Sequence, residues 1–81
     1  MKKTVCVRYF SVLREQRGLA DERVTTSTST ASELYEELRV RHGFTLSADR
    51  MRVAINDEFE AWESEIRDGD ALVFIPPVAG G

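Results

Sequence analysis

The sequence predicts an α+β fold, in which a mixed sheet carries one main helix packed on one face. Three observations support this prediction. Strand-like apolar segments stand near both ends of the chain, a well-marked helix lies between them, and the length of 81 residues suits one domain. Because the first and last strands are the most apolar, we expect them side by side in the middle of the sheet, parallel, with the helix crossing behind.

A strand, a short helix and a second strand are predicted first. Residues 4–10 alternate between two faces, with Val5, Val7 and Tyr9 on one and Cys6, Arg8 and Phe10 on the other. Ser11 is the expected N-cap of a helix over residues 12–17, and Gly18 is its expected C-cap. Residues 22–27 are rich in threonine and predict a strand at the edge of the sheet.

The main helix has the clearest signals. Thr30-Ala31-Ser32-Glu33 forms a capping box, which marks a helix start. Apolar residues then recur at helical spacing and form one stripe: Ala31, Leu34, Tyr35 and Leu38. Gly43 stands at the C-cap position.

Three further strand segments are predicted in the second half of the chain. Residues 51–55 alternate as a third strand, Asn56-Asp57 turns the chain, and residues 58–61 pair back briefly. Asp68-Gly69-Asp70 marks a sharp turn. Residues 71–75 form a continuous apolar run, which suits a central strand.

Composition excludes several classes of function. A net charge of -3 gives no attraction to nucleic acid or to an anionic membrane. Arg8 interrupts the apolar stretch that a signal peptide would need, and the longest apolar run is shorter than the roughly 20 residues of a membrane helix. Cys6 has no partner cysteine and is expected to be a buried structural thiol. We therefore expect a protein of the reducing cytoplasm.

Isolated residues offer no catalytic or metal centre. His42, next to a helix-ending glycine, is expected to interact with the helix dipole rather than to bind a metal or act as a base. Trp62 is expected to anchor an acidic loop on the core. That loop, residues 57–70, has a net charge of -6 and is expected to be a solvated face, with steering of a basic partner as the alternative.

The last six residues, Pro76-Pro77-Val78-Ala79-Gly80-Gly81, point most directly to a function. Two prolines end the strand and favour a stiff, extended polyproline II segment. Gly80 and Gly81 lack side chains and suit a narrow slot. We therefore expect a domain over residues 1–75 and a projecting tail over residues 76–81, which reaches about 20 Å at full extension.

The tip of this tail holds one reactive group, the α-carboxylate of Gly81. A free carboxylate is a poor electrophile, but an acyl-adenylate has a good leaving group and accepts an amine, a thiol or a sulfur atom. The sequence lacks a phosphate-binding loop and a dinucleotide fingerprint. We therefore expect the chain to bind no cofactor itself, with ATP used by an activating partner.

Three segments resemble the small, sulfur-carrying subunit of molybdopterin synthase, the MoaD family, and the resemblance covers the whole chain. They are residues 74–81, Tyr9-Phe10-Ser11-Val12-Leu13-Arg14-Glu15 and Asp68-Gly69-Asp70. The resemblance implies a ubiquitin-like β-grasp fold. It also implies that a ubiquitin-activating-type adenylyltransferase adenylates Gly81, and that a sulfur donor protein then supplies the sulfur of a thiocarboxylate.

The family's mechanism implies roles for further residues. The tail (Pro76, Pro77, Val78, Ala79 and Gly80) would insert into the large subunit, where the sulfur attacks cyclic pyranopterin monophosphate in molybdenum cofactor biosynthesis. The chain would then be a non-catalytic, sulfur-donating subunit of an enzyme complex. By resemblance, it docks through Phe10, Phe74 and Ile75 with help from Arg14. We expect this apolar surface to be partly exposed, although core packing is the alternative for Phe10 and Phe74.

Other functions use the same tail. A protein modifier would join Gly81 to a lysine of a target through an isopeptide bond. A sulfur carrier could instead serve thiamine or cysteine synthesis. The remaining alternative is a structural β-grasp module whose ending is accidental.

Overall fold

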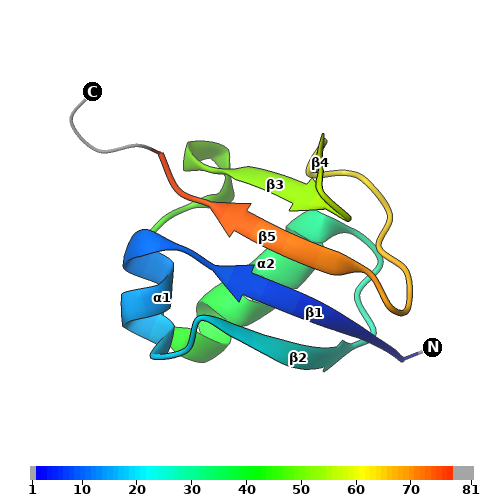
Figure 1. Cartoon of the computed structure of the whole chain (residues 1–81), viewed down its shortest axis with the longest axis horizontal. Helices are drawn as coiled ribbons and strands as arrows, with labels where there is room; N and C mark the ends of the chain where they lie inside the picture. The colour runs from blue at the N-terminus through cyan, green and yellow to red at the C-terminus, as the bar shows by residue number, and fades with distance from the viewer. Residues whose placement is uncertain (1, 78–81) are drawn as a thin grey trace.

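A mixed sheet of five strands, in the order β2-β1-β5-β3-β4, organises the chain in the computed structural model, which describes residues 2–77. Figure 1 shows its elements: β1 (Lys3–Tyr9), α1 (Ser11–Arg17), β2 (Asp21–Thr26), α2 (Ala31–His42), the 3₁₀ helix η1 (Ala48–Arg50), β3 (Arg52–Ile55), β4 (Glu58–Glu60) and β5 (Ala71–Ile75). β1 and β5 are parallel neighbours in the middle, and β2 lies at an edge. The α+β class, the central parallel pair and the edge strand are confirmed.

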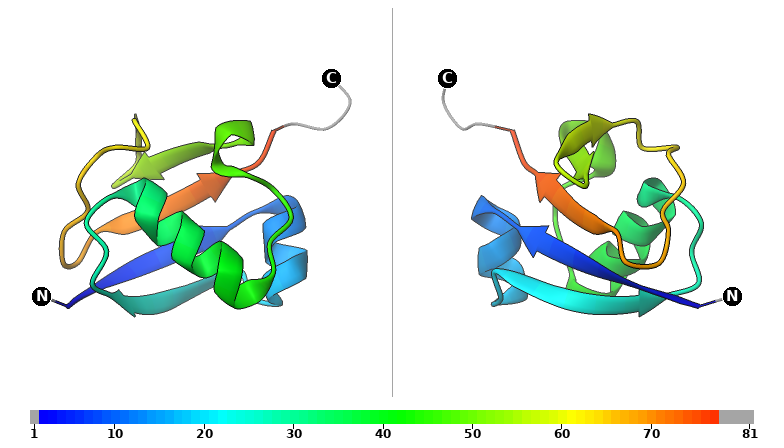
Figure 2. Two further views of the ribbon diagram at one scale, coloured as in Figure 1. Left: turned by 180° about the vertical axis from the view of Figure 1, so that it is seen from behind. Right: turned by 45° about the vertical axis from the view of Figure 1, so that its right-hand side comes forward.

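The two faces of the sheet differ. Helix α2 crosses one face, as the left view of Figure 2 shows. Alternate strand residues, among them Val7, Leu72 and Phe74, are buried on this side against the predicted stripe of α2. The other face carries no helix of the described residues and is called the open face below. Cys6 lies there and is exposed, so the prediction of a buried thiol is wrong, because its neighbours Val5 and Val7 occupy the helix side.

Helix ends follow the sequence signals, with one exception. The Thr30 hydroxyl accepts a hydrogen bond from the Glu33 amide and the Glu33 carboxylate accepts one from the Thr30 amide, which confirms the capping box. Gly43 ends α2 with a left-handed φ of 73°. The prediction that Ser11 caps α1 is wrong: the chain leaves β1 in an extended conformation through Phe10, which takes the N-cap position without a side-chain hydrogen bond. No helix within residues 2–77 is long and apolar enough to cross a membrane.

Two loops behave as predicted. Asn56 and Asp57 have φ values of 53° and 73°, which join β3 to β4 in a two-residue hairpin turn. Trp62 anchors the acidic loop: its Nε1–H donates to the Met51 carbonyl at 3.3 Å, and its ring stacks on Phe74 with centroids 5.9 Å apart.

A polar cluster centred on Glu22 ties both helices to β2. The Tyr9 hydroxyl donates to the Glu22 carboxylate at 2.6 Å, and the Arg17 guanidinium donates two hydrogen bonds to it at 2.8 and 2.9 Å. His42, the last residue of α2, places Nε2 3.7 Å from the same carboxylate. The hydrogen bonds from Arg17 hold the pKa of Glu22 at about 2, whereas burial, and then the charge of Arg17, lowers the pKa of His42.

The cluster predicts a specific acid sensitivity. The folded state lowers the pKa of Glu22 from 4.5 to about 2, so its stabilisation is present above the unfolded value and lost as the pH falls towards 2. Glu22→Gln should lower the free energy of unfolding by about 1–3 kcal/mol at neutral pH and by much less at the acid end of this window. Urea unfolding at several pH values measures this. Glu36→Gln, which removes an exposed ion pair to Arg39, is the control and should change little. An equal loss for Glu22→Gln at every pH would contradict the prediction.

Candidate functional site at the base of the tail

Strand β5 carries the chain to one end of the molecule, where the tail begins. At this end β1 finishes, α1 starts and η1 leads into β3 (Figure 1). Pro76 is buried and Pro77 is exposed, so the packed body reaches Pro76. Val78, Ala79, Gly80 and Gly81 lie outside the described residues, and their predicted roles in insertion and chemistry stay predictions.

Phe74 belongs to the core. It has no exposed surface, and its ring meets Tyr35 edge-on at 5.1 Å in addition to stacking on Trp62. The expectation that Phe74 is partly exposed is therefore wrong. The reason is the strand period of two: Phe74 pairs with Tyr9 and Val53, and all three side chains take the helix side.

The open face presents an apolar patch beside the tail, here called the tail-base patch and made of Phe10, Phe59, Val73 and Ile75. Phe10 is 43% exposed and Phe59 is 62% exposed, while Val73 and Ile75 are half-buried. Strand register connects them, because Ala54 pairs with both Val73 and Phe59. Phe10 is extended and follows Tyr9, the partner of Phe74, which places it level with Ile75.

Sequence reasoning missed Phe59. Its strand, Glu58–Glu60, has an aromatic residue between two acids and no apolar alternation. The signal lay in the turn: a two-residue hairpin at Asn56 and Asp57 pairs Phe59 with Ala54. Since Val53 and Ile55 face the helix, Ala54 and Phe59 must face the open side.

Arginines surround the tail-base patch. The guanidinium of Arg52 lies 4.7 Å from the centre of the Phe59 ring, and the Arg52 backbone pairs with Ile75. Three more exposed arginines stand at this end: Arg8 on β1, Arg14 on α1 and Arg50 on η1. Among the residues that the structure describes, none of the four has a carboxylate within 4.0 Å. Arg14, predicted to help docking, is thus an accessible cation without an ion pair among the described residues.

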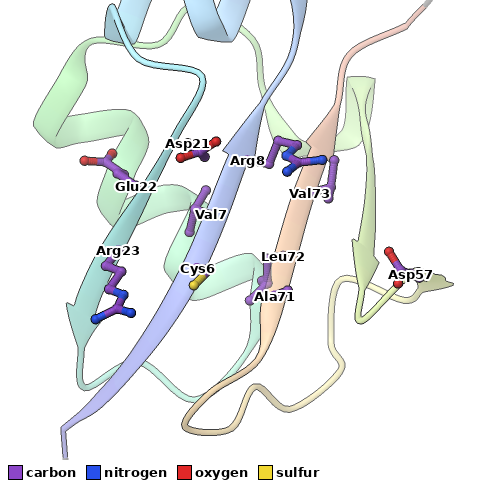
Figure 3. Close-up of a pocket in the computed structure, with 10 residues that line it drawn as sticks. All are labelled: Cys6, Val7, Arg8, Asp21, Glu22, Arg23, Asp57, Ala71, Leu72 and Val73. Atoms are coloured by element: carbon purple, nitrogen blue, oxygen red, sulfur yellow. The ribbon is translucent and has the colours of Figure 1, made fainter.

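A shallow groove of about 420 Å³ also lies on the open face. Figure 3 shows Cys6 and Arg8 on β1 beside Ala71 and Val73 on β5, with Asp57 at the far side. The lining residues mix both charges, and they include no histidine that could serve Cys6 as a base. This arrangement does not suit nucleophilic catalysis, so we place the functional site at the tail base.

Known proteins resemble this chain over nearly its whole length. The model of the ThiS family matches residues 7–81. A molybdopterin synthase sulfur carrier subunit from Haemophilus influenzae is 31% identical over 78 residues, which span 93% of this chain and 96% of the relative.

Two solved structures extend the comparison. SAMP1 from Haloferax volcanii has a TM-score of 0.79 at 26% identity, covering 96% of this chain and 99% of that chain. A protein–protein complex of subunits 1 and 2 of molybdopterin-converting factor from Helicobacter pylori includes a chain with a TM-score of 0.63 at 26% identity, with coverage of 96% and 99%. These similarities confirm the ubiquitin-like β-grasp fold.

The burial pattern predicts that Phe74 and Phe59 respond differently to truncation. Phe74→Ala should lower the free energy of unfolding by about 3–5 kcal/mol, because it leaves a cavity between the sheet and α2. Phe59→Ala should cost less than about 1 kcal/mol, since its ring is mostly in solvent. Chemical denaturation of both variants measures the difference. Equal losses would contradict the assignment of one ring to the core and the other to the surface.

Proposed function

The chain belongs to the ThiS family, and from this membership and the geometry of the tail base we propose that it is the sulfur-carrying subunit of a molybdopterin synthase. Three curated relatives that match most of its length are sulfur carrier subunits of that enzyme. The structural observation that supports the proposal is where the tail begins: the central strand β5 ends beside an exposed apolar patch, and the exposed arginines around it have no carboxylate within 4.0 Å among residues 2–77.

The proposed chemistry takes place on the Gly81 carboxylate. A ubiquitin-activating-type adenylyltransferase joins it to AMP from ATP and releases pyrophosphate. The terminal sulfur of a persulfide on a donor protein then attacks the acyl carbon, and AMP leaves. A thiol next cleaves the S–S bond, which leaves the donor cysteine in a disulfide and Gly81 with a thiocarboxylate of one oxygen and one sulfur. Inside the large subunit this sulfur displaces an oxygen substituent from a carbon of cyclic pyranopterin monophosphate, and water hydrolyses the resulting thioester and returns the Gly81 carboxylate. Two such rounds build the dithiolene that holds molybdenum.

The body of the chain positions the tail and does not carry out the chemistry. The tail-base patch would bury Phe10, Phe59 and Ile75 against the large subunit, while the surrounding arginines meet acidic groups on that partner. The Helicobacter pylori complex, in which a similar chain is seen with its second subunit, supports an interaction of this kind. Docking fixes the origin of the tail, and tail length then fixes where the Gly81 carbonyl arrives.

A second candidate function is protein modification. The similarity to SAMP1 from Haloferax volcanii favours it, since SAMP1 is a small archaeal modifier protein. Both functions begin with activation of Gly81, and they differ in the group that then attacks. The acceptor is a sulfur nucleophile in one case and a lysine amine of a target in the other.

The docking surface predicts a selective loss of affinity. Phe59→Ala should weaken binding to the large subunit about 10-fold or more, because the contact loses a large aromatic side chain that is mostly exposed in the free chain. Val40→Ala is the control: Val40 is also an exposed apolar residue, but it lies on α2, on the far side of the sheet. Calorimetric titration measures both. Equal binding by the Phe59→Ala variant and the unaltered chain would remove the open face from the interface.

The position of the acyl carbon predicts strict dependence on tail length. One residue added after Gly81 should abolish sulfur transfer, because it displaces the terminal carbonyl by about 3.3 Å, whereas reacting atoms must approach within about 3–3.5 Å. Deleting Gly81 should have the same effect, and circular dichroism should show an unchanged fold in both variants. Product formation by the reconstituted synthase is the readout. Normal activity of the extended chain would rule out Gly81 as the sulfur-bearing residue.

A further inference from the structure

The cationic side chains of this protein are unevenly divided in type and in position. The sequence has nine arginines and two lysines, and both lysines, Lys2 and Lys3, stand where β1 begins. The tail leaves from the end of β5, and β1 and β5 are parallel. The start of β1, where both lysines stand, and the end of β5, where the tail begins, therefore lie at opposite ends of the molecule (Figure 1).

Strand register gives the separation. Tyr9 pairs with Phe74, so Lys3 lies seven residues behind the level of Ile75. At about 3.3 Å per residue this is roughly 23 Å along the strands. The four residues after Pro77 span at most about 14 Å, and a lysine side chain adds roughly 6 Å. Because Pro76 and Pro77 prolong β5 away from the lysines, neither amine can reach the carbonyl of Gly81 in the same molecule.

The cations near the tail are of a different chemical kind. Arg8, Arg14, Arg50 and Arg52 are all exposed at that end, and Arg52 is the direct backbone partner of Ile75. A guanidinium stays protonated and has no free electron pair with which to attack a carbonyl. A lysine in the same place would be partly neutral under mildly basic conditions and would be a good nucleophile.

We propose that the tail end of the molecule is kept free of amines, with Arg52 as a specificity-determining position where lysine would divert the activated Gly81 acyl group into a self-amide. The inference rests on the proposed function, because only an activated Gly81 needs such protection. In the diverting reaction the amine loses a proton to solvent, a C–N bond forms at the acyl carbon, and the activating group leaves; no oxidant is involved. Arginine allows a positive docking surface without this side reaction.

The same geometry assigns the acceptor in reactions between two copies. Lys3 Nζ donates a hydrogen bond to the Thr28 carbonyl at 2.7 Å, whereas Lys2 is exposed at the start of the described chain. Any lysine-linked product of two copies should therefore join Gly81 of one to Lys2 of the other.

The test uses the full chain carrying a chemically installed Gly81 thioester of 2-mercaptoethanesulfonate, incubated at mildly basic pH with free thiol. No activating enzyme is needed, so the outcome is independent of whether sulfur is the natural acceptor. Arg52→Lys places an amine close to the tail, where the effective concentration is in the mM range, against about 10 μM for a second copy. Self-amide formation should therefore be about 100-fold faster than amide formation between unaltered chains.

Arg67→Lys is the matched control. Arg67 is exposed like Arg52, but it lies at the end of the molecule where β1 begins, near Lys2 and Lys3. Gly69, two residues after Arg67, donates its amide hydrogen to the Thr4 carbonyl on β1. Intact mass should show hydrolysis or thiol exchange for the unaltered chain and for Arg67→Lys. Arg52→Lys should give a product lighter than the hydrolysed chain by one water, with the crosslink mapped to position 52. Self-amide formation at equal rates in all three chains, or in none of them, would overturn the proposal. The arginines near the tail would then reflect only the overall amino-acid composition.

Discussion

Strands β1 and β5 lie side by side at the centre of the sheet and run in the same direction, with Tyr9 opposite Phe74. A parallel pair cannot be closed by a hairpin, so the chain between them must cross the sheet, and it does so with α2 (Figure 2). This pairing buries the helix side of both strands and places the start of β1 and the end of β5 at opposite ends of the molecule. The separation of the lysines from the tail follows from it, as does the rigid origin of the tail.

Successive residues of β5 point to opposite faces of the sheet, so residues that pack in the core alternate with residues that a partner can contact. Phe74 points to α2 and packs among Tyr35 and Trp62, while its neighbour Ile75 points to the open face next to Arg52. One strand thus supplies a core residue and a surface residue in succession, so a partner that covers Ile75 and Phe59 need not disturb the core.

Local signals made most of the fold predictable. The capping box at Thr30, the glycine at 43 and the strand periods each act within a few residues, and the sequence displays them directly. Apart from the N-cap of α1, what failed depended on which side of the sheet the helix covers. The exposure of Cys6 and that of Phe74 were both predicted incorrectly. Periodicity sorts strand residues onto two faces of the sheet, but it does not say which face the helix covers and which one a partner could reach. Phe59 and the Glu22 cluster depend on pairing between distant segments, which no short window contains.

The central claim is that Gly81 carries sulfur, and the mass of the C-terminal peptide, taken from the chain purified out of its own cells under conditions that preserve thioacids, tests it most directly. A thiocarboxylate differs from the carboxylate by the exchange of one oxygen for one sulfur, and it reacts selectively with electron-poor azides, which provides a second identification. We expect a fraction of the chain to carry this exchange at Gly81 and no other residue to carry it. A chain found only as the free carboxylate and as isopeptides to lysines of other proteins would contradict sulfur carriage and favour protein modification.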